Sequence, residues 1–597
     1  MRDAYRKIFE LFDLRERRRF AVLVLLVMAM GLFDVLGVAS ILPFLAVVSN
    51  PDTINQSDWL SWFRDVSGAR TVTGFMMVLG FTVFVFVLVT TIFRALTFYA
   101  LTRFTKMRMV SLATRLMEVY LSQPYIWFLG RHSSDLGKTI LSEVTLVVNG
   151  PITAAMRLLA NGVMLSLLVL FLFVMEPLAA IGGVVIFGGT YGLIFLATRM
   201  RLSQMGQGRV EANKAQFQII HEAMAGIKNV KIRSLERSYL ERFRIPSHAN
   251  ARQQAGLALI SELPRQLLEV IAFGGMVLFV LWLLARNDGV IGDVVPILGV
   301  YAFAAARMFP TIQQLFSAIS EIRFGKPALD QLHAELTQST GLRLPDRAAA
   351  AIPLKQSLEL DRVTFAFPNA GRAALKDLSL TIAANTTVGI VGSTGAGKTT
   401  TVDIILGLLT PQGGQLRVDG VVIDESNVRG WQRSVGYVPQ EIFLIDDTVA
   451  SNIAFGVPAA EIDMEAVKAA ARVAELHDFV QTLPQGYATE VGERGARLSG
   501  GQRQRIGIAR ALYANPDILV FDEATSALDN LTERAIMAAI GALGHSKTIV
   551  VIAHRLSTVR HCDLVYLLEG GRVVAADHYD GLVEKNDHFR ALHEATA

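Results

Sequence analysis

Long apolar stretches dominate the first 330 residues, and each has the length of a helix that crosses a lipid bilayer, for which about 20 residues are needed. Polar residues are concentrated between these stretches. The stretches are residues 20–48, 72–93, 158–175, 177–198, 266–285 and 294 to about 318. Buried helices of a soluble protein would not require so many apolar runs in so short a chain. The pattern therefore predicts six transmembrane helices. The first run is too long for the apolar core of a cleaved signal peptide.

The basic residues between these runs predict the orientation of the helices. Lys and Arg are concentrated before the first run and in the connections 103–138 and 199–265, whereas 50–71, 176 and 286–293 are acidic or neutral. Since cytoplasmic connections carry the excess of Lys and Arg, both termini and the long basic connections are predicted to be cytoplasmic. These connections are expected to be helices that continue past the bilayer.

Three short segments interrupt this pattern. The stretches Gln123–Phe128 and Glu222–Lys228 are expected to form transverse turns at the tips of the cytoplasmic extensions, although plain loop packing is an equal alternative. In the connection 50–71, Trp59, Leu60, Trp62, Phe63 and Val66 recur at helical spacing and are expected to form one apolar face. This spacing predicts a short amphipathic helix that lies on the outer leaflet or packs locally against the spans.

Composition separates the chain into two parts. Residues 1–330 hold 33 Lys and Arg against 22 Asp and Glu, a net of +11, and the remainder holds 24 against 31, a net of −7. We therefore predict a helical membrane domain at 1–330, a linker at 331–355 and an α/β domain at 356–597. The single cysteine, Cys562, excludes a disulfide framework and a cysteine-rich metal site. The acidic second part argues against a general nucleic-acid-binding surface.

The second part contains a phosphate-binding loop. The strand-like run Thr387–Val391 leads into a G-x-x-x-x-G-K-T segment, which is followed by a helical run. The segment comprises Gly392, Ser393, Thr394, Gly395, Ala396, Gly397, Lys398, Thr399 and Thr400. In such a loop the backbone N–H groups surround phosphate oxygens, Lys398 lies at the β- and γ-phosphates and Thr399 offers its hydroxyl to Mg²⁺. The segment predicts nucleotide binding.

A pair of acids follows a second apolar strand, Ile518–Phe521. Asp522 suits the Mg²⁺ shell, and Glu523 suits polarisation of an attacking water molecule. Taken alone, this segment is equally consistent with a strand that ends in two solvated acids.

Between these segments, Leu498–Gln504 resembles the signature of ATP-binding-cassette (ABC) proteins, with Ser499, Gly500, Gly501 and Gln502 at its centre. Four further residues match motifs of the same family, in the family's order along the chain. Phe367 matches the aromatic residue that stacks on adenine, and Gln440 matches the Q-loop glutamine, which also contacts the metal. Asp529 matches the D-loop aspartate, and His554 matches the switch histidine. Thr489–Gly495 is similar to the segment of exporters rather than importers.

The resemblance implies an ABC exporter half-transporter that hydrolyses ATP with Mg²⁺. Glu523, His554 and Gln440 would be its catalytic residues. The signature loop would meet the γ-phosphate of a nucleotide held by a second copy, so a homodimer is expected. The two tip segments would be coupling helices at the cassettes. The bacterial inner membrane would be the location.

Charges inside apolar spans are costly and indicate function. Asp34, Glu269 and Arg307 lie within the runs. Arg94 directly follows the second run, in the span that it begins, and Arg265 lies at the start of the fifth. Arg94, Arg265 and Arg307 could bind the phosphate oxygens of a head group through their forked guanidinium groups. Internal ion pairs of Asp34 or Glu269 with an arginine are the alternative.

A narrower resemblance concerns the first span. The segments Asp34–Leu45 and Ser49–Pro51, and the run Gly397–Leu409, are similar to bacterial lipid-linked oligosaccharide flippases. The sequence therefore favours an ATP-driven flippase that moves a polyprenyl-pyrophosphate-linked oligosaccharide to the outer leaflet. A general lipid or multidrug exporter, a peptide or protein exporter and a nucleotide-gated channel are the alternatives.

Overall fold

The computed structural model describes residues 2–596 except 176, 287–293, 338–349, 369, 524–535, 537, 540–545 and 554. It divides into two compact units. One comprises Met1–Gln123 with Gly130–Leu344, and the other comprises Pro124–Leu129 with Pro345–Ala597. We call the first the membrane unit and the second the cassette unit, and describe each by itself.

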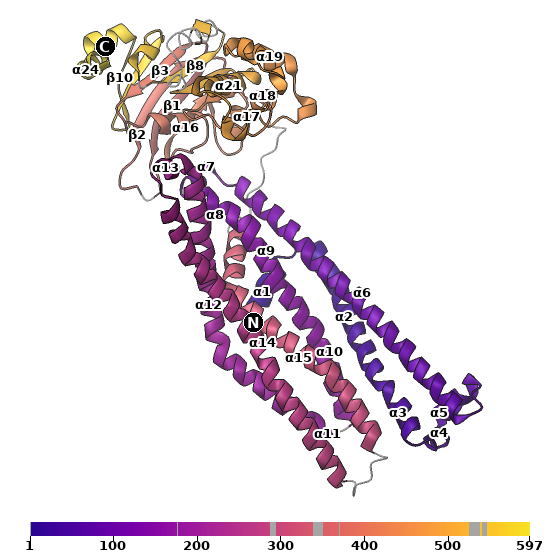
Figure 1. Cartoon of the computed structure of the whole chain (residues 1–597). Coiled ribbons are helices and arrows are strands. Elements are labelled where there is room, and N and C mark those ends of the chain that lie inside the picture. Colours follow the sequence, from indigo (N-terminus) through magenta and orange to yellow (C-terminus); the bar gives the residue numbers. More distant parts are fainter. Residues whose placement is uncertain are drawn as a thin grey trace. The chain divides into compact units, whose positions relative to one another are not determined.

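The membrane unit is helical throughout its described residues (Figure 1). Its α-helices are α1 (Arg2–Glu10), α2 (Leu14–Ala39), α3 (Ile41–Ser49), α4 (Thr53–Gln56), α5 (Asp58–Ser67), α6 (Val72–Leu121), α8 (Ser133–Lys138), α9 (Val144–Val147), α10 (Thr153–Met175), α11 (Pro177–Gly183), α12 (Gly189–Ala225), α13 (Ile227–Ile232), α14 (Glu236–Arg286) and α15 (Val294–Thr337). Single π-helical turns at 139–143, 148–152 and 184–188 join α8 to α10 and α11 to α12.

Four helical stretches in the described residues are long and apolar enough to cross a membrane, namely Leu14–Ser49, Val72–Leu121, Ser134–Met175 and Ala180–Ala225. They contain the first three predicted runs and all but the first three residues of the fourth, and the fifth and sixth runs lie in α14 and α15. The 50 residues of α6 correspond to about 75 Å of helix, more than twice the thickness of the hydrocarbon core. The long connections are therefore helical extensions, as the sequence suggested.

The first apolar run is not one uninterrupted helix. Helix α2 ends at Ala39, and α3 begins at Ile41. Pro43 explains the break, because a proline has no N–H to donate and its ring clashes with the carbonyl four residues earlier, that of Ala39. The chain continues in nearly the same direction through Ser40, which keeps helical φ and ψ angles of −64° and −19°.

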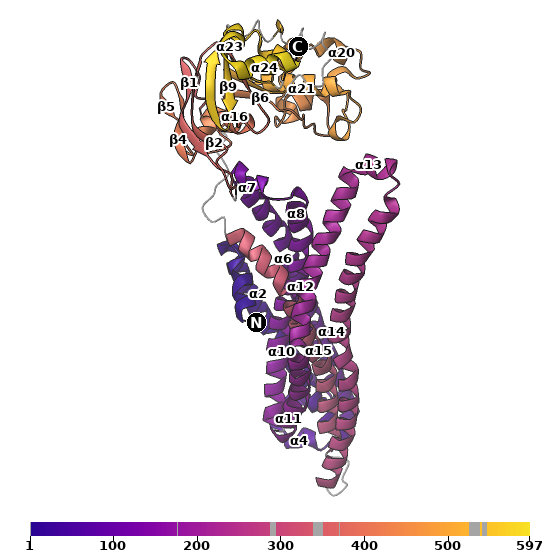
Figure 2. The ribbon, with the colours of Figure 1, turned by 90° about the vertical axis from the view of Figure 1, so that its left-hand side faces the viewer.

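Two segments at the ends of the long helices have the expected helical form. Helix α13 (Ile227–Ile232) joins α12 to α14 at their tip (Figure 2). The transverse segment predicted at Glu222–Lys228 therefore begins later than expected, after Gly226, because α12 continues to Ala225. At the opposite end, α4 and α5 connect α3 to α6. Leu60 of α5 is buried there against Ile54 and Phe75. The opposite face of α5 leaves Trp59 and Trp62 exposed by 53% and 64%.

The cassette unit begins with α7 (Tyr125–Leu129), a segment distant in sequence from the rest of the unit. Its strands are β1 (Ser357–Phe365), β2 (Leu375–Ala383), β3 (Thr387–Gly392), β4 (Gly413–Val418), β5 (Val421–Val422), β6 (Val435–Val438), β7 (Ile518–Asp522), β8 (Thr548–Ile552), β9 (Leu564–Glu569) and β10 (Arg572–Asp577). Its α-helices are α16 (Lys398–Ile405), α17 (Val428–Gln432), α18 (Val449–Ile453), α19 (Met464–Val473), α20 (His477–Gln481), α21 (Gly500–Tyr513), α23 (Tyr579–Lys585) and α24 (Asp587–Thr596).

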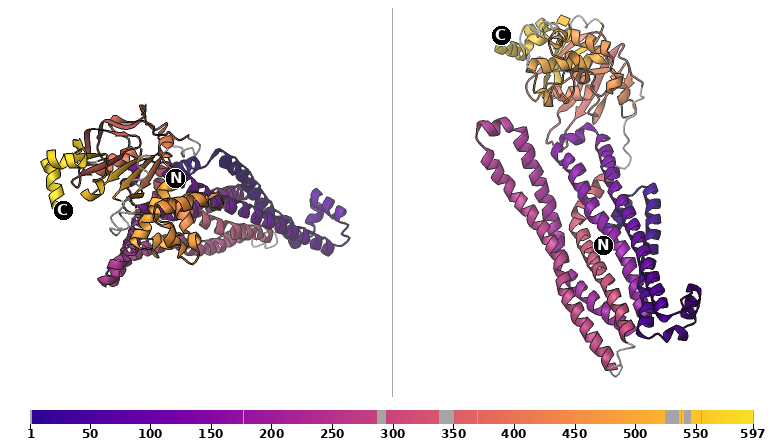
Figure 3. Two further views of the ribbon diagram at one scale, coloured as in Figure 1. Left: turned by 90° about the horizontal axis from the view of Figure 1, so that it is seen from above. Right: turned by 45° about the vertical axis from the view of Figure 1, so that its right-hand side comes forward.

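In the described part of the cassette unit the strands form two sheets, which Figure 3 shows from two further directions. One is antiparallel, in the order β2-β1-β4-β5, and the other has the order β10-β9-β3-β8-β7-β6. In the second sheet, β6, β7, β8, β3 and β9 are parallel neighbours. Every residue of β7 and β8 is buried, as expected for parallel strands covered on both faces.

Candidate functional site

The order of the parallel strands brings the sequence motifs together. The phosphate-binding loop follows β3, the Q-loop follows β6 and the two acids end β7. Because the carboxyl ends of parallel strands meet at one edge of a sheet, loops that are distant in sequence share a crevice there. Strand β8 ends at this edge as well, and the predicted switch histidine, His554, and the D-loop residue Asp529 lie outside the described residues.

The phosphate-binding loop requires glycine at defined points. Gly397 has φ +103°, and a Cβ there would lie 2.7 Å from a Leu375 methyl group. Gly392 has φ +153°, and a Cβ there would lie 2.3 Å from the Leu568 carbonyl oxygen. Other residues would be strained in these conformations as well as clashing. The loop therefore passes close to the sheet and turns its backbone into the N-terminus of α16.

Lys398 lies within this loop. Its Nζ donates hydrogen bonds to the carbonyl oxygens of Gly392, at 2.7 Å, and Ser393, at 3.2 Å. Burial lowers the pKa of Lys398, and the nearby carboxylates of Glu523 and Asp522 oppose that shift. The ammonium group is thus held in the cradle where phosphate oxygens are expected to bind.

The three candidate metal ligands all carry the oxygen donors that Mg²⁺ prefers. Thr399 lies exposed in the first turn of α16, Asp522 is 7% exposed at the end of β7 and Gln440 is exposed just after β6. Mg²⁺ usually takes only one or two protein ligands and completes its shell with water and phosphate oxygens. The hydroxyl, carboxylate and amide at this edge therefore fit a nucleotide-bound Mg²⁺.

Glu523 is held in an unusual backbone conformation. Its φ is +50°, in the left-handed region that non-glycine residues seldom adopt. Its Oε2 accepts a hydrogen bond of 2.6 Å from Gln440 Nε2. Gln440, the proposed metal ligand, is therefore in direct contact with Glu523, the residue proposed to polarise the attacking water.

The signature segment caps a helix. Ser499 is the N-cap of α21, and its hydroxyl accepts from the Gln502 backbone N–H at 3.2 Å, while Gln502 Oε1 accepts from the Ser499 N–H at 2.8 Å. Gly500 and Gly501 form the first turn. This capping box presents the positive end of a 14-residue helix, which is suited to an anion.

Phe367 lies two residues beyond the end of β1. Its ring packs edge-on against Phe365, with the ring centroids 5.1 Å apart. The side chain is half-buried and packs against the hydrophobic core that the two sheets share. This packing fixes the orientation of the Phe367 ring, as stacking on the adenine of a nucleotide requires.

The structure adds two residues that the motif search missed. Burial and the charge of Asp522 raise the pKa of Asp403, in α16, to about 6. The Tyr437 hydroxyl, in β6, lies 3.5 Å from Asp522 Oδ2. Asp403 could have been found from its spacing, since it lies one helical turn after Thr399, whereas Tyr437 carries no comparable signal in the sequence.

In the membrane unit, the candidate arginines fall into two groups. Arg94 and Arg307 both pair with Asp34, with Arg307 Nη1 at 4.0 Å from Asp34 Oδ1. Arg265 instead pairs with Glu269, one turn along α14, at 3.1 Å, where both side chains are more than half exposed. Internal ion pairing therefore does occur, yet one carboxylate shared by two arginines leaves one positive charge in excess.

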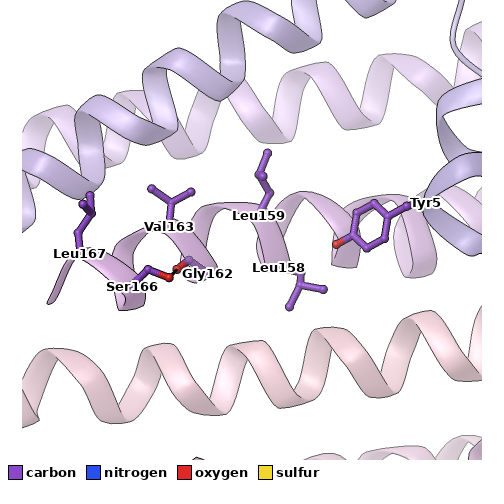
Figure 4. A pocket seen from close by; sticks show the side chains of 7 residues that line it. All are labelled: Tyr5, Leu158, Leu159, Gly162, Val163, Ser166 and Leu167. Carbon is purple, nitrogen blue, oxygen red and sulfur yellow. Dashed lines mark hydrogen bonds between the residues drawn. The ribbon is translucent and has the colours of Figure 1, made fainter. Parts of the chain in front are cut away.

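A cavity of about 480 Å³ lies along α10, and Figure 4 shows the side chains that line it. It is lined by Tyr5, Leu158, Leu159, Gly162, Val163, Ser166 and Leu167. The Tyr5 hydroxyl donates to the Ala155 carbonyl at 3.4 Å, and the Ser166 hydroxyl donates to the Gly162 carbonyl at 2.8 Å. The two hydroxyl hydrogens are thus used within the chain, and the apolar lining does not suit a phosphate head group.

Comparisons with known proteins agree with this geometry. A family model described as "ABC transporter" matches residues 375–526. The chain is 32% identical, over 80% of both chains, to the ATP-dependent lipid A-core flippase of Alkalilimnicola ehrlichii. It belongs to the ABC transporter family.

Further matches extend over nearly the whole exporter. The ATP-dependent lipid A-core flippase of Aromatoleum aromaticum is 31% identical over 80% of this chain and 78% of its own. A solved bacterial Atm1-family ABC exporter with ATP bound superposes with a TM-score of 0.78, covering 97% of this chain and 98% of its own at 24% identity. The fold is thus that of an ABC exporter, a helical membrane domain followed by a nucleotide-binding domain that couples ATP hydrolysis to transport.

Proposed function

We propose that this ABC exporter is a flippase that moves a polyprenyl-pyrophosphate-linked oligosaccharide from the cytoplasmic to the outer leaflet. The observation that supports this cargo most directly is the group formed by Asp34, Arg94 and Arg307, three residues of the membrane unit. A lipid-linked cargo also agrees with the names of the relatives, which flip lipid A-core.

The charge balance of this group favours an anionic head group. Asp34 is only 3% exposed, whereas Arg94 and Arg307 keep 32% and 22% of their side chains exposed. Arg94 Nε is buried and has no hydrogen-bond partner among the described residues. Since an arginine binds phosphate through two parallel hydrogen bonds, the excess charge and unused donor suit a pyrophosphate. Arg265, exposed at the start of the fifth run, is the third proposed contact.

The outward-facing side of α5 supports a lipid tail. Trp59, Trp62 and Val66 follow one another at helical spacing and are exposed by 53%, 64% and 66%, while Leu60 anchors the other side. Tryptophan is favoured where lipid head groups meet acyl chains. This face is proposed to lie at the outer leaflet and to contact the polyprenyl chain.

The proposed nucleotide cycle uses two copies of the chain. The loop 392–400, Phe367 and Asp529 bind ATP in one copy, and Ser499–Gln502 of the other copy meets its γ-phosphate. Thr399, Asp522 and Gln440 hold Mg²⁺, Glu523 polarises water and His554 contacts the γ-phosphate. Helices α7 and α13 transmit cassette closure to the spans. The cassettes and both termini are proposed to be cytoplasmic at the inner membrane.

Reconstitution tests the proposal. Liposomes containing the protein receive a fluorescent polyprenyl-pyrophosphate oligosaccharide, and a membrane-impermeant quencher reports which leaflet holds it. ATP is expected to move the probe across the bilayer with the wild-type chain and not with Glu523→Gln. No ATP-dependent movement, or equal movement with the variant, would contradict the flippase.

Lipid A-core is the second candidate cargo, favoured by the relatives with 32% and 31% identity. The same assay with labelled lipid A-core separates the two. Faster movement of lipid A-core than of the polyprenyl probe would favour this second cargo. Stimulation of ATP hydrolysis by unrelated amphiphiles, unaffected by Arg94→Gln and Arg307→Gln, would instead indicate a general lipid or multidrug exporter.

A further inference from the structure

Tyr437 has a position from which it can orient Asp522. In the parallel pairing of β6 with β7, Tyr437 lies opposite Val520. Asp522 is two residues further along β7, so its side chain is on the same face of the sheet as that of Val520. The Tyr437 hydroxyl lies 3.5 Å from Asp522 Oδ2. The tyrosine is half-buried, and it packs against the hydrophobic core that the two sheets share.

We propose that Tyr437 is a positioning residue that orients the Asp522 carboxylate toward Mg²⁺. A hydrogen bond to one carboxylate oxygen fixes the rotation of the group and directs the other oxygen to the metal.

The ring and the hydroxyl of Tyr437 can be separated experimentally. Tyr437→Phe keeps the ring that packs against the core and removes the hydroxyl that reaches Asp522. A purely structural role would survive this change, whereas a positioning role would not. Tyr487→Phe is the matched control, because its hydroxyl contacts His477 Nδ1 at 2.9 Å rather than a residue of the nucleotide site.

The readout is metal binding by the full-length chain in nanodiscs. Mn²⁺ replaces Mg²⁺, ADP is saturating, and electron paramagnetic resonance measures the free ion. We expect Tyr437→Phe to weaken Mn²⁺ binding about tenfold, the lower end of the effect of removing a residue that orients a metal ligand. The affinity for a fluorescent ADP in EDTA should not change, which shows that the site remains folded. Unchanged Mn²⁺ affinity in Tyr437→Phe would overturn the proposal.

The inference rests on the proposed metal role of Asp522, which Asp522→Asn tests separately. If that variant binds Mn²⁺ as the wild type does, the metal role itself fails. If Asp522→Asn loses binding and Tyr437→Phe does not, only the tyrosine inference fails.

Discussion

The protein contains two charged sites that are built in opposite ways. In the cassette unit, Lys398, Asp522 and Glu523 follow the ends of strands β3 and β7, in loops that a parallel sheet must bring to one edge. In the membrane unit, Asp34, Arg94 and Arg307 come from α2, α6 and α15 and meet through helix packing alone. Each residue of the first site belongs to a short motif at the end of a strand, which the sequence shows directly. The residues of the second site belong to no motif, and only the packing of the helices brings them together.

The largest effect is expected from Glu523→Gln in the cassette unit. The amide keeps the shape of the side chain but cannot accept the proton of the attacking water. A general base contributes about 100- to 10,000-fold to the rate, so ATP hydrolysis should fall at least 100-fold. ATP binding, measured with a fluorescent analogue, should remain. Hydrolysis above a tenth of the wild-type rate would show that Glu523 is not the base.

The same contrast explains what could be predicted from the sequence. Apolar run length predicted helices within α2, α6 and α10, and strand-loop-helix order predicted the loop around Lys398. The break at Ser40 depends on Pro43, which a count of apolar residues does not register. The shared use of Asp34 by Arg94 and Arg307 could not be predicted, because residues 60 positions apart along the chain are joined only by the packing of α2 on α6. Tyr437 carries no motif of its own.

Asp34→Asn should produce the largest loss of stability in the membrane unit. It leaves two adjacent arginines without their carboxylate, and removing one partner of a buried pair costs about 3 kcal/mol or more. The melting temperature in detergent should fall by several degrees. The double variant Asp34→Asn/Arg94→Gln removes one of the two unpaired charges and should recover part of that loss.

The double variant also decides the cause. If it melts below the single variant, the loss comes from disrupted packing and not from unpaired charge. ATP hydrolysis in the cassette unit is not expected to require Asp34, which lies in the membrane unit. Basal ATP hydrolysis near the wild-type rate therefore serves as the control for an intact nucleotide site.

Asp403→Asn should stabilise the chain by a smaller, pH-dependent amount. The pKa of Asp403 is raised to about 6, above the value near 3.9 of an unfolded chain. The native structure therefore disfavours the charged form, and the stability that the neutral acid gives below about pH 4 is lost as the pH rises through 6. The variant should melt a few degrees above the wild type at pH 8, and the difference should vanish toward pH 4. A difference independent of pH would contradict this origin.

The smallest effect is expected from Arg265→Gln, which removes an ion pair that is more than half exposed on both sides. Exposed pairs contribute less than about 1 kcal/mol, so the melting temperature should change by about a degree or less, in contrast to Asp34→Asn.

If Arg265 also contacts the head group, the apparent KM for the lipid-linked oligosaccharide in the liposome assay should rise two- to threefold, while kcat for ATP hydrolysis stays constant. Glu269→Gln is the matched control, because it breaks the same pair but keeps the arginine. An equal rise in KM in both variants would show that the pair, and not the cation, affects transport, and would restrict the head-group site to the charges around Asp34.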